Sequence, residues 1–246
     1  MTVVTLADRP DLLGAWWGMP TSWPEFMYHD PVAQRLVGRT SEIAPHLQLA
    51  GLGPDGDVLA CLRCIPFAWD GDPASLPDRG WDAILERGVA DAEGGREPTA
   101  VSLLEATVRP DQQGHGLSTE LLMAARRTVA GQGLPDLFGP VRPSGKSAEP
   151  RTPIGAYVAR RRADGLPADP WLRVHVRLGG RVVRVAPLSM TIAGTPGDWR
   201  AWTGLPFDTD GDVEVPGALT PVHVDLASDH VVYVEPNVWV RHRVGP

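Results

Sequence analysis

The strongest constraint on the fold lies between residues 101 and 129, where a β-prone apolar run turns through glycines into an amphipathic helix. The run from 101 to 108 is expected to be a strand, and Pro110 should end it because proline has no amide hydrogen for a strand ladder. From Leu117 onward, apolar residues recur at helical spacing until Val129. The segment therefore predicts a strand, a glycine turn and a helix in direct succession.

The glycines explain what such a turn can do. Gly114 and Gly116 permit backbone angles that a β-carbon would oppose, and they leave room for a ligand against the main chain. Several amides could then point at one anion, at the positive end of the helix dipole. Each hydrogen bond to a charged partner contributes about 1.5–3 kcal/mol, so the turn could hold a diphosphate without a lysine. The sequence here follows neither the P-loop pattern nor the G-x-G-x-x-G dinucleotide fingerprint.

The residues of the turn resemble the acyl-CoA signature of the GNAT acetyltransferase superfamily, Q/R-x-x-G-x-G/A. The matching positions are Gln113, Gly116 and Ser118, preceded by Val108 and Pro110 and followed by Leu121 and Leu122. Ser118 departs from the pattern, because the family usually has Gly or Ala there. The resemblance implies that acetyl-CoA or another acyl-CoA is the co-substrate and that its pyrophosphate binds at the turn. The residues implied in this binding are Val108, Gln113, Gly114, His115, Gly116, Leu117, Ser118 and Thr119.

A second segment, residues 171–180, resembles a later helix of the same family. Apolar residues at 171, 174 and 178 share a helical face with His175, and the glycines that follow suit a helix C-cap. In the family, a tyrosine three residues before a Leu-Gly pair often protonates the departing CoA thiolate. His175 holds that position here, and an ordinary histidine pKa near ~6.5 would let it carry a proton near neutral pH. A core histidine bonded to backbone is the alternative.

Glu105 is the candidate catalytic base. The resemblance implies direct acyl transfer to an amine, and an alkyl amine is mostly protonated at neutral pH, so it needs a base or a base with a water chain. Glu105 lies among apolar residues in the strand that leads into the glycine turn. Partial desolvation there would make the carboxylate a better base. An exposed glutamate on the strand face is the alternative.

The acceptor side is expected to draw on the segment after the strand at 137–141. Arg142 and Lys146, the only lysine of the chain, could neutralise a substrate carboxylate or the 3′-phosphate of CoA. A solvated basic turn is the alternative. Ser144 lies between these two residues, and Trp69 falls in another segment that is expected to line the acceptor side.

Composition excludes several classes of function. The net charge of −7 argues against a general nucleic-acid surface, because phosphate binding favours a basic face. No apolar run approaches the ~20 residues of a membrane span, and the N-terminus lacks a basic region followed by an apolar one. We therefore expect a cytoplasmic protein with no membrane partner. Cys61 and Cys64 should face opposite sides of a strand, so we expect no zinc site, no redox pair and no other metal.

The order of elements predicts one α/β (α+β) GNAT-like domain over residues 1–246, with a central mixed, mostly antiparallel sheet flanked by helices. Strands are expected at 47–52, 58–68, 101–108, 137–141 and 182–192, and helices at 12–17, 31–37, 81–88, 117–129 and 171–178. The loop 142–170 is too long for a plain connector and is expected to shape a site. The resemblance covers about residues 45–192. Residues 193–246 form an extension with further strands at 213–215, 221–224 and 231–243, which could close over the substrate or pair two subunits as a homodimer.

Three functions remain open at this point. The first and favoured one is an acyl-CoA-dependent N-acyltransferase that transfers an acetyl group directly, in a ternary complex, to a small-molecule amine that can also carry an acid group. The second keeps the fold but decarboxylates malonyl-CoA or acylates a carrier-protein thiol, as GNAT-like loading domains of polyketide synthases do. Those domains are similar in using a histidine with a hydroxyl residue, here His175 with Ser144. The third is a CoA-binding regulator without catalysis.

Overall fold

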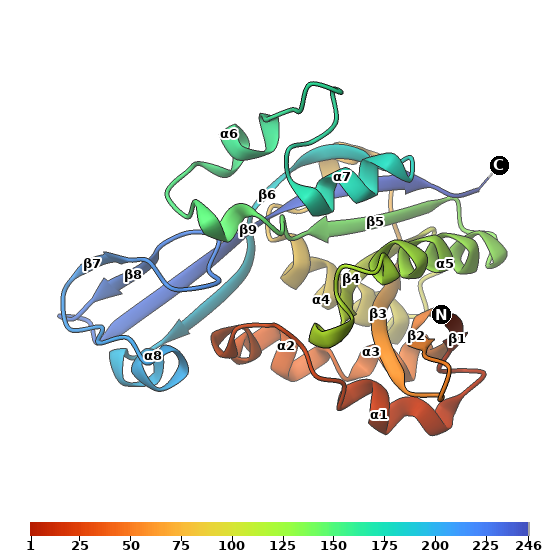
Figure 1. The fold of residues 1–246 in the computed structure, drawn as a ribbon, viewed down its shortest axis with the longest axis horizontal. Helices are drawn as coiled ribbons and strands as arrows, with labels where there is room; N and C mark the ends of the chain where they lie inside the picture. Colours follow the sequence, from red (N-terminus) through yellow and green to blue (C-terminus); the bar gives the residue numbers. More distant parts are fainter. Residues whose placement is uncertain (246) are drawn as a thin grey trace.

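The computed structural model describes residues 1–245, and all of its strands belong to one sheet (Figure 1). The strands are β1 Thr2–Thr5, β2 Leu49–Leu52, β3 Val58–Phe67, β4 Ala100–Val108, β5 Asp136–Val141, β6 Arg181–Gly194, β7 Gly211–Val213, β8 Val222–Asp225 and β9 His230–Arg243. Their order in space is β1-β2-β3-β4-β5-β9-β8-β7, and β6 also pairs with β9. Only β4 and β5 run parallel. The fold is therefore α/β with the mixed, mostly antiparallel sheet that the sequence predicts.

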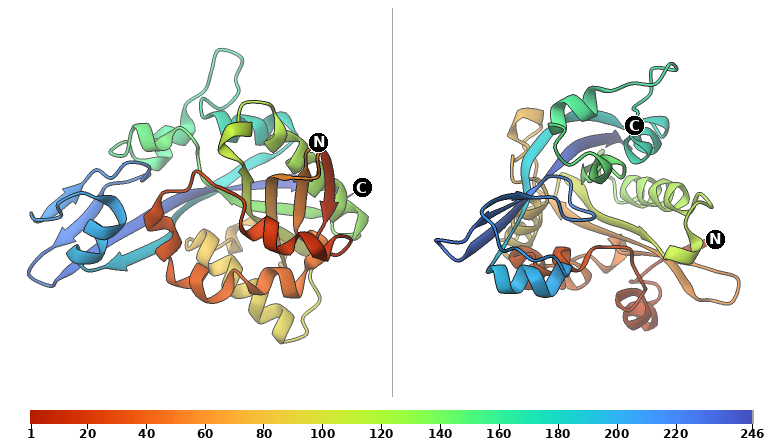
Figure 2. Two further views of the ribbon diagram at one scale, coloured as in Figure 1. Left: turned by 60° about the horizontal axis from the view of Figure 1, so that its bottom comes forward. Right: turned by 60° about the vertical axis from the view of Figure 1, so that its left-hand side comes forward.

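Helices cover both faces of this sheet (Figure 2). They are α1 Leu13–Trp17, α2 Pro31–Leu36, α3 Arg39–Ile43, α4 Gly80–Glu93, α5 Leu117–Gly131, α6 Ile154–Ala159, α7 Pro170–Arg177 and α8 Pro196–Thr203, with the short 3-10 helix η2 at Glu25–His29. Neighbouring residues of β4 face opposite cores, Leu103 toward α5 and Leu104 toward α4. Within residues 1–245, no helix combines the length and the apolar character needed to cross a membrane.

The two parallel strands separate soon after they meet. Val101 pairs with Leu137 and Ser102 with Phe138, and the β4–β5 ladder ends there. From this point β4 continues toward the glycine turn, while β5 follows β9 instead. The register between β3 and β4 also shifts at this level, so that Leu104 is an extra, bulged residue directly before Glu105. The separation leaves room for a site between the two strands.

The extension after residue 192 is continuous with the central sheet. Strand β9 pairs with β5 through its C-terminal half and with β8 through its N-terminal half, and β6 follows its other edge. Together with α8, this part projects from the rest of the molecule at the left of Figure 1. The sequence predicts β8 and β9, whereas β7 lies at Gly211–Val213 and shares only one residue with the strand predicted at 213–215. It does not predict α8, although Thr195 and Asp198 form a capping box at the start of that helix.

Candidate active site

A cleft of about 820 Å³ lies where β4 and β5 separate. On the side of the glycine turn its lining includes Val108, Gln113, Gly114, Gly116, Leu117 and Ser118. On the other side the lining comes from the N-terminal segment, β4, the segment after β5, and β9. The polar residues on that side include Arg63, Glu105, Arg142, Ser144, Glu235 and Asn237. The cleft thus extends from the predicted cofactor turn to a chamber lined by these polar residues.

The turn before α5 presents a row of open backbone amides. Within residues 1–245, the amides of residues 114–118 have no acceptor, and Gly116, the N-cap of α5, supplies no side-chain cap. Gly114 and Gly116 have φ values of 83° and 80°, in the left-handed region that favours glycine. A β-carbon at either position would meet nothing within 4 Å, so the space in front of the amides is open. These residues fit the diphosphate of an acyl-CoA.

The neighbours of these amides have other partners. The side-chain amide of Gln113 donates to the Val108 carbonyl and to Ser22 Oγ, both at 3.3 Å, and so ties the end of β4 to the N-terminal segment. The ring Nδ1 of His115 lies 3.2 Å from the Gln112 carbonyl. The amide of Thr119 donates to the Gly116 carbonyl at 2.9 Å. The Thr119 amide is therefore not open to a ligand, and only the side chain of Thr119 remains for the predicted contact.

Glu105 lies in the cleft with its carboxylate held at both oxygens. Its Oε1 accepts from Thr107 Oγ1 at 2.7 Å and from Trp23 Nε1 at 3.2 Å. Its Oε2 accepts from Arg63 Nε at 3.3 Å. The side chain remains 23% exposed, so an acceptor amine or a water molecule can reach it. The carboxylate is therefore held in one orientation, and the alternative of a freely exposed glutamate does not describe it.

Arg63 is a site residue that sequence reasoning missed. It follows the apolar run of β3, and its guanidinium carbon lies 4.4 Å and 4.1 Å from the ring centroids of Trp16 and Trp17. Its Nη1 donates to Thr40 Oγ1 at 3.2 Å. Burial lowers the pKa of Arg63, and the charge of Glu105 opposes that shift. The signal in the sequence was a single arginine within an otherwise apolar strand.

Arg142 lies on the opposite side of the cleft, directly after β5. Its Nε donates to Glu235 Oε2 at 2.9 Å, and its Nη2 donates to the Gly217 carbonyl. Among residues 1–245, its Nη1 has no hydrogen-bond partner. The guanidinium carbon lies 5.5 Å from the ring centroid of Trp23, whose indole nitrogen bonds to Glu105. Trp23 therefore stands between a carboxylate and a guanidinium.

A buried hydrogen-bond network fixes Arg142 in this position. Glu235 is 1% exposed and accepts from the Tyr233 hydroxyl at 2.8 Å and from Asn237 Nδ2 at 3.0 Å. Ser189 in turn donates to Asn237 Oδ1 at 2.5 Å. The polar side-chain atoms of Glu235, Tyr233, Asn237 and Ser189 all have partners, so Nε and Nη2 of Arg142 are held by a rigid part of the cleft. None of Glu235, Tyr233 or Asn237 was predicted, because β9 supplies them from far along the sequence.

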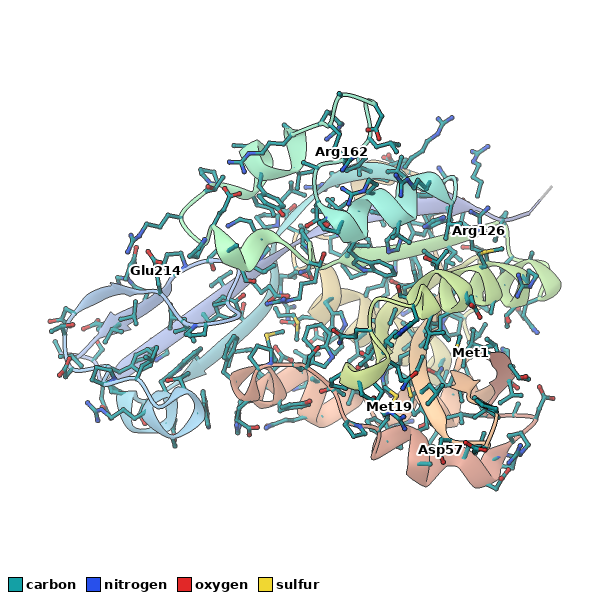
Figure 3. All side chains as sticks on the ribbon, in the orientation of Figure 1. Met1, Met19, Asp57, Arg126, Arg162 and Glu214 are labelled. Carbon is teal, nitrogen blue, oxygen red and sulfur yellow. The ribbon has the colours of Figure 1, made fainter. Side chains whose placement is uncertain are left out.

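Lys146 does not reach the cleft, which corrects the expectation that it meets a ligand. Its side chain is fully buried, and Nζ donates to the carbonyls of Glu149, Pro150 and Leu219 at 2.7, 3.1 and 2.7 Å. An ammonium group has three hydrogens, so none remains for a ligand. Lys146 instead fastens the segment 142–170 to the C-terminal extension. Glu214, labelled on the projecting part in Figure 3, makes a second link to this segment through Arg151.

Trp69 is also outside the cleft, contrary to expectation. Its ring packs edge-on against Phe138, with 4.7 Å between centroids, and Arg241 lies over it at 4.7 Å. The tryptophans that do line the cleft are Trp17, Trp23, Trp81 and Trp171. Ser144 lines the cleft and is exposed. The aromatic side of the chamber therefore comes mainly from the N-terminal segment and α7.

His175 contributes to the lining of the cleft, but its side chain is almost fully buried. It is 1% exposed, and its Nδ1 lies 2.9 Å from Nε2 of His242 on β9. Burial, and then the neighbouring His242, lowers the pKa of His175 to about 3. The ring is therefore uncharged near neutral pH, which corrects the expectation of an acid that carries a proton there. A core histidine describes it better, although its partner is another histidine and not backbone.

Replacing His175 with Gln is expected to lower the melting temperature while leaving kcat near that of the wild type. The change removes one half of a buried histidine pair but no group that is protonated at neutral pH. The loss of kcat should be far smaller than the ~10²–10⁴-fold that a general acid contributes. Thermal unfolding and thiol-release kinetics at pH 7 measure both quantities. A large loss of kcat with an unchanged melting temperature would return the acid role to His175.

The cysteines occupy separate cores. Cys61 packs with residues of α1, and Cys64 belongs to the core beneath α5. Both thiols are buried and free, and burial raises the pKa of each well above its usual value. In the part of the chain that the structure describes, no three His, Cys, Asp or Glu side chains are grouped so that they could hold a metal ion.

No family model matches the chain, but comparison with a known enzyme shows its family. The arginine N-acetyltransferase avaD of Aspergillus versicolor is 34% identical to it, over 98% of this chain and 93% of that enzyme. The chain belongs to the GNAT superfamily. It is a GNAT-type N-acetyltransferase.

Solved structures of GNAT proteins share the fold. The loading GNATL domain of CurA from Lyngbya majuscula has a TM-score of 0.63 and 16% identity, over 99% of this chain and 97% of that chain. The GNAT-like decarboxylase GphF, solved with isobutyryl-CoA, has a TM-score of 0.55 and 16% identity, over 99% and 100% of the two chains. At such identities the likeness concerns the fold alone. The acceptor and the catalytic residues of this enzyme depend on its own site.

Proposed function

We propose that this GNAT enzyme acetylates the α-amine of a free amino acid similar to arginine, with acetyl-CoA as the donor. The observation that carries the proposal is the placement of Glu105 and Arg142 on two sides of one cleft, with Trp23 between them. A carboxylate and a guanidinium so placed complement the ammonium and the carboxylate of an amino acid. The substrate in the name of the curated relative, arginine, supports the same class.

The choice of nitrogen follows from proton affinity. A guanidinium group has a pKa above ~12 and stays protonated near neutral pH, so it is not a nucleophile. An α-amine loses its proton far more readily. Glu105 is the base that takes this proton, directly or through a water molecule, while Arg142 Nη1 holds the carboxylate and so orients the amine.

The open amides of residues 114–118 would hold the pyrophosphate of the donor, with the Ser118 hydroxyl as an additional donor to phosphate. When bound, an acyl-CoA supplies an electrophilic thioester carbonyl. The cleft connects the glycine turn to Glu105, so donor and acceptor can be bound together, as direct transfer in a ternary complex requires.

The same site gives less support to decarboxylation or to transfer onto a carrier protein. That alternative uses a histidine together with a hydroxyl residue. Ser144 is exposed at the cleft, whereas the ring of His175 is buried against His242, so among the described residues these two do not form a pair. A regulator without catalysis would have no use for the donors that orient Glu105.

A comparison of two acceptors tests the proposal. With acetyl-CoA, L-arginine is expected to have a kcat/KM about 10–10² times that of L-argininamide, which lacks only the carboxylate charge that Arg142 would bind. The amide is the matched control because its α-amine is deprotonated more easily, so chemistry alone would favour it. Thiol release and mass spectrometry of the product measure the rates and the acetylated nitrogen.

Two results would contradict the proposal in different ways. Equal kcat/KM for the two acceptors would show that Arg142 does not bind the acceptor carboxylate, although the protein would still be an N-acetyltransferase. If amines never release thiol and malonyl-CoA loses carbon dioxide instead, the reaction itself is wrong. Changing the acceptor is cleaner than changing Arg142, because removing that side chain would leave Glu235 buried without its cation.

A further inference from the structure

Two aspartates outside the cleft lining, Asp30 and Asp82, are buried next to each other. They are 0% and 2% exposed. Asp30 is the N-cap of α2, where its Oδ1 accepts from the Ala33 amide at 2.7 Å. Asp82 lies in the first turn of α4. Helices α2 and α4 pack against each other, and each aspartate acts on the pKa of the other, so the pair lies where the starts of the two helices meet.

The pair has too little positive charge around it for two ionised carboxylates. Within residues 1–245, Asp30 Oδ2 and Asp82 Oδ1 are buried without a hydrogen-bond partner. The cation in reach is Arg79, with its Nη2 4.0 Å from Asp82 Oδ2, but Arg79 is half exposed and already bonds to Glu86 at 3.0 Å. Two buried carboxylates this close repel each other unless one of them is protonated. A protonated carboxyl can donate to its neighbour and satisfy both.

The other groups packed around the pair do not change this balance. Strand β6 offers the backbone of Thr191, which lowers the pKa of both aspartates by hydrogen bonding. Of the charged or titratable side chains on the other elements, Arg35 of α2 pairs with Glu86 of α4, and Asp198 bonds to Thr195 at the start of α8. His29 Nε2 lies 3.4 Å from Glu25 in η2 and has no hydrogen-bond partner within residues 1–245.

The pair connects two elements that border the acceptor end of the cleft. Helix α2 lines the cleft with Ala33 and Gln34, and Val37, directly after the helix, lines it as well. Trp81, the residue before Asp82, also lines it and donates its indole hydrogen to the Leu104 carbonyl at 2.8 Å, at the bulge before Glu105. We call this side of the cleft, formed by Ala33, Gln34, Val37 and Trp81, the acceptor wall. A change in the distance between Asp30 and Asp82 would therefore move the acceptor wall directly.

We propose that Asp30 and Asp82 share one proton at neutral pH, and that this proton fastens α2 to α4 and so positions the acceptor wall. Loss of the proton would leave two buried charges on facing helices, move α2 away from α4 and weaken acceptor binding. The amides of residues 114–118 lie on another part of the chain, so CoA binding would not change. The effect on acceptor binding rests on the proposed function, whereas the effect on stability does not.

The direction of the pH dependence follows from the proton count. Burial, and then the charge of Asp30, raises the pKa of Asp82 to about 8, whereas an aspartate in the unfolded chain titrates near ~3.9. Between these values the native state binds one proton more than the unfolded state. Stability therefore falls as pH rises from about 4 to about 8, and above that range this pair causes no further loss.

The decisive variant is Asp82→Asn, which keeps the shape, removes the charge and leaves an amide that can donate to Asp30 at any pH. Between about pH 5.5 and pH 9, the wild type is expected to lose several degrees in melting temperature that the variant does not lose. The ratio of wild-type to variant KM for L-arginine should rise over the alkaline part of this range. The ionisation of the acceptor amine changes KM equally for both proteins, so it cancels in this ratio.

Controls and a direct reading of the proton complete the experiment. Glu93→Gln removes an acid at the other end of α4, where it pairs with Arg39, and should keep the wild-type pH dependence. Carbon-13 NMR of aspartate carboxyls should find a single proton on the pair at pH 7. Two ionised carboxyls, or identical pH dependence of stability in wild type and Asp82→Asn, would overturn the shared proton.

The two parts of the inference can fail separately. A changed pH dependence of stability with a constant KM ratio would keep the shared proton and overturn its role in positioning the acceptor wall. If L-arginine is not acetylated at all, the proposed function fails, and the melting curves still decide the shared proton.

Discussion

Replacing Glu105 with Gln is expected to lower kcat by about 10²–10⁴-fold, the range that a general base contributes. Glutamine has nearly the same shape and can still accept from Thr107, but it cannot take a proton from an acceptor amine. The open amides of the glycine turn do not contact Glu105, so the Kd for CoA is expected to stay the same. Thiol release gives kcat, and calorimetry gives the affinity for CoA.

The matched control for this variant is Glu120→Gln. Glu120 is an exposed acid on α5 whose carboxylate lies 3.6 Å from the amino group of Met1, outside the cleft lining. It should keep full turnover. Because Glu105→Gln also takes a charge partner from the buried Arg63, the melting temperature is measured with the rate. Wild-type kcat in a folded Glu105→Gln enzyme would assign the base elsewhere.

Local signals were sufficient for the part of the fold that holds the cofactor turn. The predicted strand at 101–108 and helix at 117–129 correspond to β4 Ala100–Val108 and α5 Leu117–Gly131. Apolar periodicity, one proline and two glycines define these boundaries, and all of them act within a few residues of the chain. The position of the glycine turn, and its left-handed backbone at Gly114 and Gly116, could therefore be predicted from the sequence.

Elements that depend on distant partners were missed. Strand β1, Thr2–Thr5, is an edge strand whose ladder is made entirely with β2, far along the chain. Helix α3, Arg39–Ile43, is short, buries Thr40 and has no side-chain cap. Neither has enough periodicity to be recognised alone. The capping box of α8 was a usable local signal that the sequence analysis did not apply.

The chemistry of the site depends even more on long-range contacts. Arg142 meets Glu235 across 93 residues, and His175 meets His242 across 67. The first contact keeps Arg142 in the cleft. The second keeps the ring of His175 buried, and it is therefore uncharged near neutral pH. Residue type alone predicted that Arg142 could meet a substrate carboxylate or the 3′-phosphate of CoA, but not that Glu235 would hold it. It could not predict that the ammonium group of Lys146, four residues later, would donate all three of its hydrogens to backbone carbonyls.

Replacing Gly116 with Val is expected to weaken CoA binding by about 10²-fold or more, the equivalent of losing one or two hydrogen bonds to a charged group. Nothing in the protein lies within 4 Å of a β-carbon at this position, so the valine would not collide with the chain. It would occupy the space in front of the open amides. Calorimetry with CoA measures the loss of affinity.

The variant also carries a cost in stability, and Gly133→Val separates that cost from the loss of binding. Gly116 and Gly133 have φ values of 80° and 75°, and neither has an atom within 4 Å of a built β-carbon. A side chain at such angles costs about 1–2 kcal/mol in either place. Gly133 lies in the turn after α5, at the opposite end of that helix from the glycine turn. Similar melting temperatures with a loss of CoA affinity confined to Gly116→Val would assign the diphosphate to this turn, whereas equal affinity in both variants would exclude it.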